Sequence, residues 1–175
     1  MVLSYSLGSI TGAYFLTKWM IGKDIRQLGS GNVGARNAGQ QLGKKGFIYT
    51  LLIDSLKVFI TLYMTSILFP ENEIMLLVSS FCLLIGHIWP IQLGFKGGKG
   101  VVVFLASTLC IAPIAIVVLG ISMGIMYMLV RNFTIAGLFS MAAIPITAYI
   151  MGDTQIAAGL FILFAIVVSL HVGRK

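Results

Sequence analysis

Long apolar segments separated by short polar ones constrain this chain more than any other feature. A helix needs about 20 apolar residues to cross the hydrocarbon of a bilayer. The apolar and aromatic residues make up 58% of the chain and the charged residues 10%, with a mean hydropathy of +1.01. These values exclude a water-soluble globular enzyme and a disordered chain. Six apolar segments lie at residues 2–22, 47–69, 74–92, 101–130, 135–150 and 155–170.

The segment at 101–130 decides how many times the chain crosses the membrane. As one straight helix it would be about 45 Å long, which is too long for a single crossing. Pro113 lies near its middle and favours a break there. With two crossings, ten of the twelve basic residues fall on one side and three acidic residues, Glu71, Glu73 and Asp153, fall on the other. Because Lys and Arg concentrate in cytoplasmic loops, we predict seven transmembrane helices and an external amino terminus. The cytoplasmic segments would be 23–46, 93–100, 131–134 and 171–175.

The fold class predicted from this pattern is an all-α bundle of transmembrane helices, folded as one domain over residues 1–175. Membrane lipid would surround it. The net charge is +7, but the basic residues are scattered and form no stripe, so we expect no nucleic-acid partner. The His and Cys residues have no metal-ligand spacing, so we expect no metal site either.

The first cytoplasmic segment contains a glycine-rich stretch at 26–39. Gly29, Gly31 and Gly34 let the backbone turn its amide groups toward one point, and Arg26 and Arg36 add positive charge. This composition predicts a phosphate site. The alternative is a flexible loop whose charge only reflects topology.

The second cytoplasmic segment places Gly97, Gly98 and Gly100 around Lys99, directly before an apolar helix. A helix amino terminus favours an anion, so this stretch also predicts a phosphate cradle. Two such loops on one face indicate a site for one or two phosphorylated ligands at the cytoplasmic boundary. His87, shortly before the second loop, is either a base or a structural hydrogen-bond donor.

Asp54 and Lys57 lie three residues apart in an apolar segment and share one helical face. Charged groups within a membrane span usually face the bundle interior and pair with each other. We favour a structural ion pair over direct participation in chemistry.

The order and spacing of these motifs resemble those of the bacterial membrane acyl-phosphate:glycerol-3-phosphate acyltransferases. The resemblance also implies seven spans, a cytoplasmic active site and a place in the bacterial inner membrane. It extends from the amino terminus to about residue 134. The matching residues are Gly8-Ser9-Ile10, Gly29-Ser30-Gly31-Asn32 with Gly34 and Asn37, Asp54 with Lys57, Gly86-His87 with Pro90, and Phe95 with Gly97-Gly98-Lys99-Gly100.

The resemblance implies transfer of an acyl group from acyl phosphate to the 1-hydroxyl of glycerol 3-phosphate. It implies no cofactor, and a monomer is plausible. By motif match, Lys99 and Ser30 would be the catalytic residues. The substrate-binding residues would be Gly29, Gly31, Asn32, Gly34, Arg36, Asn37, His87, Gly97, Gly98, Gly100 and His171.

The chain departs from the family pattern in three places. Gln40 stands where the family usually has Arg, and Thr134 and Gly137 stand in a helix where the family presents serines. The carboxy-terminal motif is shortened, since only His171 matches it. Two alternatives therefore remain beside the acyltransferase: a transporter of a small phosphorylated anion, and a homologue without turnover.

Overall fold

The computed structural model describes residues 1–173, in which the regular structure is helical and contains no strand. The predicted all-α fold is thereby confirmed. The helices are α1 (Val2–Ser9), α2 (Gly12–Ile21), η1 (Ile25–Gln27), α3 (Ala35–Leu68), α4 (Glu73–Ile88), η2 (Ile91–Leu93), α5 (Val101–Ile111), α6 (Pro113–Val130), α7 (Phe133–Met141), α8 (Ala143–Ile150) and α9 (Thr154–Gly173).

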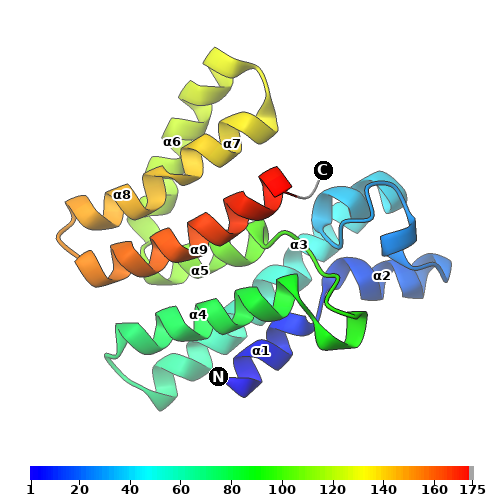
Figure 1. Cartoon of the computed structure of the whole chain (residues 1–175), viewed down its shortest axis with the longest axis horizontal. Coiled ribbons are helices and arrows are strands. Elements are labelled where there is room, and N and C mark those ends of the chain that lie inside the picture. Colours follow the sequence, from blue (N-terminus) through cyan, green and yellow to red (C-terminus); the bar gives the residue numbers. More distant parts are fainter. Residues whose placement is uncertain (174–175) are drawn as a thin grey trace.

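These helices make seven passes that alternate in direction through the described part of the chain (Figure 1). Five passes are long and apolar enough to cross a bilayer: Ala35–Leu68, Glu73–Leu93, Pro113–Val130, Phe133–Ile150 and Thr154–Gly173. The broken pair α1–α2 makes a sixth pass, and the 11-residue α5 makes the seventh. The arrangement agrees with the seven helices expected from the charge pattern.

The predicted break within 101–130 is present at Ala112. Its backbone leaves the helical region at φ −139° and ψ 69°, and Pro113 is the first residue of α6. Proline suits this position because its missing N–H has no helical partner to lose. The segment therefore consists of two helices, as the proline position indicated.

Two segments differ in detail from a simple alternation of helix and loop. The segment 2–22 is not one continuous helix, because Ile10 and Thr11 adopt extended backbone angles between α1 and α2. The segment 23–46 is a loop only in its first part, since α3 already begins at Ala35. Gly43, at φ 71°, separates the first turns of α3 from the apolar part of that helix. Alternation of apolar segments does not reveal either feature.

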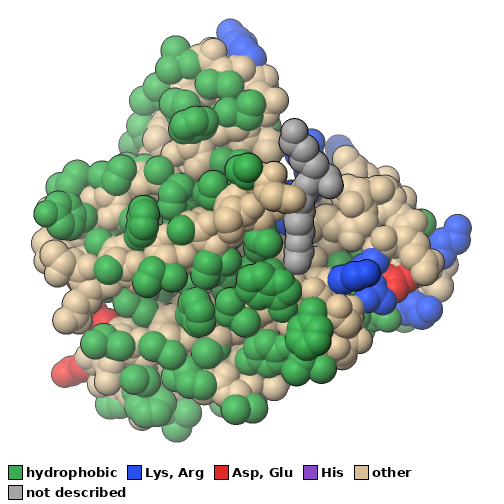
Figure 2. Space-filling model, viewed as in Figure 1, with side chains coloured by type: hydrophobic (Ala, Val, Ile, Leu, Met, Phe, Trp, Pro, Cys, Tyr) green, Lys and Arg blue, Asp and Glu red, His purple; other side chains and the backbone are tan. Residues whose placement is uncertain are grey.

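The main core lies where α3, α4, α5 and α9 pack together, and its fully buried side chains include Leu84, Phe104 and Leu160. The outer surface is also mostly apolar, as expected for helices that face lipid, and Figure 2 shows hydrophobic side chains over much of it. In α6 the only buried residue is Ala115. Lys and Arg side chains gather in Figure 2 over the end of the bundle where the α2–α3 connection lies.

Candidate active site

The connection between α2 and α3, which we call loop 1 (residues 22–34), is tied to the connection between α4 and α5, loop 2 (residues 89–100). The Asp24 carboxylate accepts from the backbone N–H of Arg26 at 2.9 Å and also from its guanidinium. Arg26 Nη1 in turn donates to the carbonyl of Leu93 at 2.6 Å. The hydrogen bond from the Arg26 side chain holds the pKa of Asp24 below its usual range. One arginine thus fixes the two loops relative to each other.

Asn37, in the first turn of α3, organises loop 1 from within. Its Nδ2 donates to the carbonyls of Leu28 and Asn32, both at 3.0 Å, and to that of Ile25 at 3.4 Å. Its Oδ1 accepts from the Ser30 N–H at 3.3 Å. The residue is 1% exposed. Asn37 therefore holds the loop backbone in shape with its side-chain amide.

Several amides of loop 1 are engaged inside the loop. The Gly31 N–H donates to Leu28 at 2.9 Å, and Gly29 and Gly31 adopt positive φ values of 55° and 70°. The first helical hydrogen bond of α3 runs from the Ala38 N–H to Gly34, so the amides preceding Ala38 in the first turn have no helical acceptor. Loop 1 therefore offers the amino terminus of α3 and the exposed Ser30 side chain rather than a ring of glycine amides.

The paired glycines of loop 2 also serve close packing. Gly97 and Gly98 donate their N–H groups to the carbonyls of Ile88 and His87, both at 3.1 Å. A Cβ on Gly97 would collide with the His87 carbonyl, and one on Gly98 would collide with the His87 ring and meet the Val33 carbonyl at 2.7 Å. Only glycine therefore allows loop 2 to lie against α4 and loop 1 together.

Beyond these glycines, loop 2 ends at the amino terminus of α5. Gly100 caps it at φ 82°, and its carbonyl accepts from the Phe104 N–H at 2.9 Å. The amides of Val101–Val103 precede the first helical bond and carry the positive end of the helix dipole. Lys99, which is partly buried, directly precedes this helix start.

A pocket of about 270 Å³ lies between the two loops and is lined by Asp24, Arg26, Gln27 and Lys96. Two other cations from the sequence analysis are near this end of the bundle. Arg36 Nη1 donates to Thr134 Oγ1 at 2.9 Å. Lys99 lies close enough to His171 for the two side chains to interact electrostatically. The structure thus brings the predicted loop residues and His171 to one end of the bundle. Residues 174–175 of the last predicted cytoplasmic segment lie outside the described residues.

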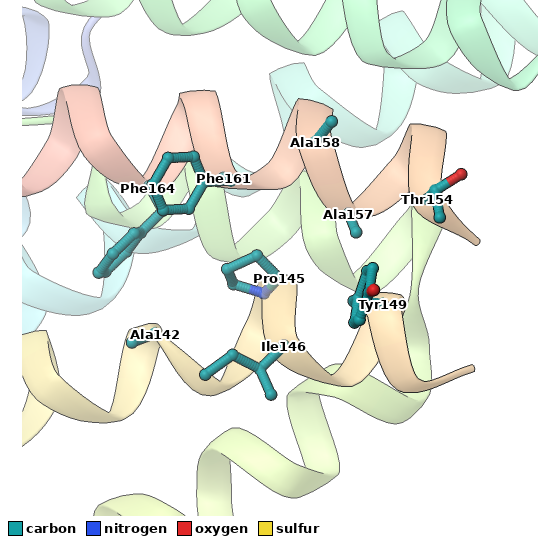
Figure 3. Close-up of a pocket in the computed structure, with 9 residues that line it drawn as sticks. All are labelled: Ala142, Pro145, Ile146, Tyr149, Thr154, Ala157, Ala158, Phe161 and Phe164. Atoms are coloured by element: carbon teal, nitrogen blue, oxygen red, sulfur yellow. The ribbon is translucent and has the colours of Figure 1, made fainter. Parts of the chain in front are cut away.

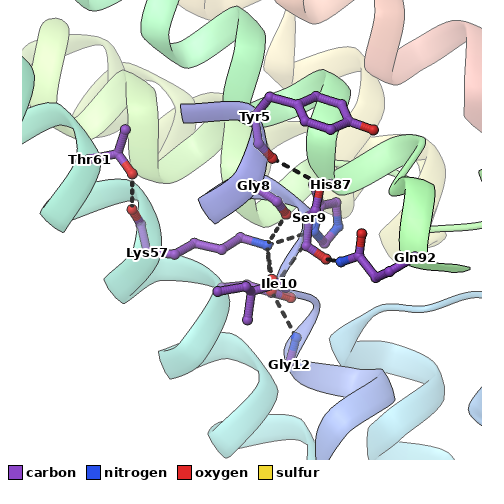
Figure 4. Close-up of polar contacts among 10 residues, drawn as sticks. Tyr5, Gly8, Ser9, Ile10, Gly12, Lys57, Thr61, His87 and Gln92 are labelled. Carbon is purple, nitrogen blue, oxygen red and sulfur yellow. Dashed lines mark hydrogen bonds and ion pairs between the residues drawn. The ribbon is translucent and has the colours of Figure 1, made fainter. Parts of the chain in front are cut away.

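Asp54 and Lys57 form the expected ion pair, with Lys57 Nζ 3.0 Å from Asp54 Oδ1. The pair closes the break between α1 and α2, where Figure 4 shows Lys57 reaching toward Gly8 and Ile10. Lys57 Nζ donates to the carbonyls of Gly8 at 3.0 Å and Ile10 at 2.6 Å. Asp54 Oδ1 accepts from the Gly12 N–H at 3.2 Å. The cation caps the carboxyl end of α1 and the anion caps the amino end of α2, which matches both helix dipoles.

Two further side chains join α1 to loop 2 and were not identified from the sequence. Gln92 Nε2 donates to the Ser9 carbonyl at 2.6 Å, and Tyr5 Oη donates to the Trp89 carbonyl at 2.7 Å. Neither residue carries a charge or lies in a glycine-rich motif. Their partners are backbone carbonyls more than eighty positions away, so no local pattern indicates them.

One apolar pocket is separate from the loops. It has a volume of about 470 Å³ and lies between α8 and α9. Figure 3 shows Pro145 and Tyr149 from α8 facing Ala157 and Phe161 from α9. No charged side chain lines it, so the polar chemistry belongs to the loop end.

The fold and this end of it define a polytopic helical membrane protein with a polar, basic site between two interhelical loops. Residues 1–174 match the family model described as glycerol-3-phosphate acyltransferase. The chain belongs to the glycerol-3-phosphate acyltransferase family, and it is a multi-pass membrane protein.

Relatives and solved structures agree with this assignment. The chain is 35% identical over 175 residues to glycerol-3-phosphate acyltransferase 1 of Bacillus thuringiensis subsp. konkukian, covering 100% of this chain and 95% of the relative. It is 37% identical to the protein of that name from Desulfitobacterium hafniense, covering 96% and 83% of the two chains. The crystal structure of PlsY (YgiH), an integral membrane glycerol 3-phosphate acyltransferase in its glycerol 3-phosphate form, superposes with a TM-score of 0.84 at 26% identity, covering 99% of this chain and 91% of that one.

Proposed function

We propose that this protein transfers an acyl group from acyl phosphate to the 1-hydroxyl of glycerol 3-phosphate, giving 1-acyl-glycerol 3-phosphate and phosphate. This is the first step of phospholipid synthesis. The observation that carries the proposal is that loops 1 and 2, which lead into the amino termini of α3 and α5, are joined by the Arg26 hydrogen bond to Leu93 at the basic end of the bundle. Two phosphorylated substrates need two such anion sites.

The two sites receive different roles in this proposal. The Ser30 hydroxyl, Asn32, Gly34 and the start of α3 contact one substrate phosphate, with Arg36 beside them. Lys99 and the start of α5 stabilise the charge that develops on the departing phosphate. The remaining members of the site shape the loops: Asn37 through its four contacts, and Gly29, Gly31, Gly97, Gly98 and Gly100 through backbone angles and close packing.

The chemistry requires no covalent enzyme intermediate, because an acyl phosphate is already activated. The 1-hydroxyl oxygen forms a bond to the acyl carbon while the bond from that carbon to the phosphate oxygen breaks. The electron pair leaves with phosphate, and a substrate phosphate oxygen takes the hydroxyl proton. The protein contributes alignment of the two substrates and electrostatic stabilisation.

The proposed setting is the bacterial inner membrane, with residues 1–175 acting as one domain and the loop end in the cytoplasm. The apolar surface and the surrounding lipid would receive the acyl chain, while both phosphates stay at the polar boundary. The site needs no metal or organic cofactor in this mechanism.

The decisive experiment supplies the purified chain with acyl phosphate and glycerol 3-phosphate and measures both lysophosphatidic acid and phosphate. We expect equal amounts of the two products. Glycerol in place of glycerol 3-phosphate is the matched control, because it keeps the hydroxyl and removes the phosphate. Product formation with glycerol at the same rate would contradict a phosphate site. Flux of glycerol 3-phosphate into vesicles without product would favour a transporter, and binding without product would favour a homologue that lacks turnover.

A further inference from the structure

Lys57 contacts a third buried side chain, that of His87, in addition to Asp54 and the two backbone carbonyls. Its Nζ is 3.0 Å from Nδ1 of His87 (Figure 4). The same nitrogen is 3.8 Å from Asp54 Oδ1. The exposed fractions of the three residues are 1% for Asp54, 5% for Lys57 and 3% for His87. Asp54, Lys57 and His87 therefore form one buried cluster, which we call the buried triad.

The proton positions in the buried triad follow from the chemistry of the partners. An ammonium group has three protons and no lone pair, and here it has four neighbours that can accept. An N–H on Nδ1 would point at this cation with nothing to accept it, so the Nδ1 that faces Lys57 carries no proton. A single carboxylate, Asp54, balances a single buried cation. A charged His87 would add a second cation without a partner, so the imidazole is neutral and its proton lies on Nε2.

The Nε2 atom of His87 points to the place where the two loops meet. The ring lies against Gly98 so closely that no Cβ fits there. The carbonyl of Val33, from loop 1, lies beside the same glycine. A proton on Nε2 is thus presented at the junction of loop 1 and loop 2.

We propose that the Asp54–Lys57 pair holds His87 in its Nε2–H tautomer, which makes His87 a permanent hydrogen-bond donor at the loop junction and excludes it as the general base of acyl transfer. Asp54 and Lys57 are then positioning residues for the site, in addition to capping α1 and α2. This inference rests on the proposed function only for its kinetic consequence. The tautomer itself is a property of the protein alone.

The second histidine provides an internal reference. His171 Nδ1 lies 2.8 Å from the Val167 carbonyl, which can only accept, so His171 carries its proton on Nδ1. The chain has two histidines, and the structure assigns them opposite tautomers.

The spectroscopic test uses the full chain in lipid with ¹⁵N-labelled imidazole rings at neutral pH. A His171→Gln variant assigns the remaining signals to His87. We expect a protonated Nε2 and an unprotonated Nδ1 for His87, and the reverse for His171 in the unsubstituted chain. A His87 ring protonated on Nδ1, or on both nitrogens, would overturn the proposal whether or not the protein has acyltransferase activity.

The kinetic test uses two variants that each keep one half of the imidazole. His87→Gln places an amide N–H near the position of Nε2, whereas His87→Asn places an acceptor near the position of Nδ1 and lacks the distant donor. We expect His87→Asn to lower kcat about a hundredfold and His87→Gln less than about tenfold, with thermal unfolding measured for both. Equal losses, or a greater loss in His87→Gln, would contradict the donor role.

A third variant tests the positioning role of Lys57. In Lys57→Met the Nδ1 of His87 loses its donor, so we expect the His87 ring signals to show a mixture of tautomers. An unchanged Nε2–H tautomer in the folded variant would remove Lys57 as its cause. If the unpaired Asp54 prevents folding, the Lys57→Met, Asp54→Asn double variant removes both charges. We expect the His87 ring signals of this double variant to show the same mixture of tautomers.

Discussion

The Arg36 guanidinium donates a 2.9 Å hydrogen bond to the Thr134 hydroxyl, 98 positions further along the chain. Arg36 belongs to the first turn of α3, beside loop 1, and Thr134 to the first turn of α7. The α6–α7 hairpin otherwise packs mainly against α5 and α8. This contact therefore connects the hairpin to the candidate active site, through one of the positions at which the chain departs from the serines of the family pattern.

Thr134→Val removes the hydroxyl acceptor and keeps the shape of the side chain. A single hydrogen bond of this kind contributes about 1 kcal/mol, so we expect KM for glycerol 3-phosphate to rise about fivefold. Thr134→Ser is the control, because it keeps the hydroxyl. Equal effects of the two variants on KM would show that the hydrogen bond is irrelevant to the site.

Lys99→Ala should lower turnover by at least about tenfold, because it removes a preorganised charge beside the departing phosphate. Lys96→Ala is the matched control from the same loop, and it should mainly raise KM, since Lys96 lines the pocket beside Arg26. Steady-state kinetics on both variants separates the effects. A greater loss of kcat in Lys96→Ala would move the reacting phosphate into that pocket.

Asn37→Asp keeps an oxygen for the Ser30 N–H but loses the Nδ2 donor shared by three carbonyls. Unsatisfied buried carbonyls are costly, so we expect the free energy of unfolding to fall by about 2 kcal/mol or more. Thermal unfolding in detergent provides the measurement. Asn72→Ala removes an exposed helix cap on α4, so it is the control and should cost about 1 kcal/mol. A smaller effect at Asn37 than at Asn72 would contradict its role in shaping loop 1.

The Asp24–Arg26 pair predicts a pH dependence. The Arg26 hydrogen bond lowers the pKa of Asp24, so the pair stabilises the folded protein fully at pH values above 3.8, the ordinary pKa of Asp. This stabilisation is lost as the pH falls through the lower pKa that Asp24 has in the folded protein. Unfolding measured from neutral pH downward should show this loss in the unsubstituted chain. In Asp24→Asn the same acid-dependent component should be missing, and its persistence would assign it to another carboxylate.

Topology is tested with single cysteines in a chain whose Cys82 and Cys110 are replaced by Ser. Cysteines at Asn72 and Asp153, at the acidic turns, should react with an impermeant thiol reagent in intact cells, and one at Gln27 should not. Labelling at Gln27 but not at Asn72 would invert the orientation. Labelling at Asn72 without Asp153 would contradict the alternating passes on either side of Ala112.

Some features of the site were accessible from local pattern and some were not. The two glycine-rich loops, Lys99 and the Asp54–Lys57 pair were identified because each lies within a few residues along the chain. Which backbone amides are available to bind a ligand could not be predicted, since Gly97 and Gly98 donate their N–H groups to carbonyls of α4. Whether a backbone amide is available for a ligand depends on what packs against it, and this cannot be inferred from a glycine count.

The sequence by itself determined that the chain is a membrane protein, that it makes seven passes, and that Pro113 divides the longest apolar segment. These properties follow from transfer of apolar segments into lipid and from backbone restrictions, both of which act locally. Only the tertiary structure decided that the first pass is broken at Ile10 and Thr11, between α1 and α2. Extended backbone at Ile10 leaves unpaired polar groups inside the bundle, and these are acceptable only because Asp54 and Lys57 from α3 reach them. The same packing brought His87 to Lys57, and so a charge pair that caps two helices also determines where a distant imidazole carries its proton.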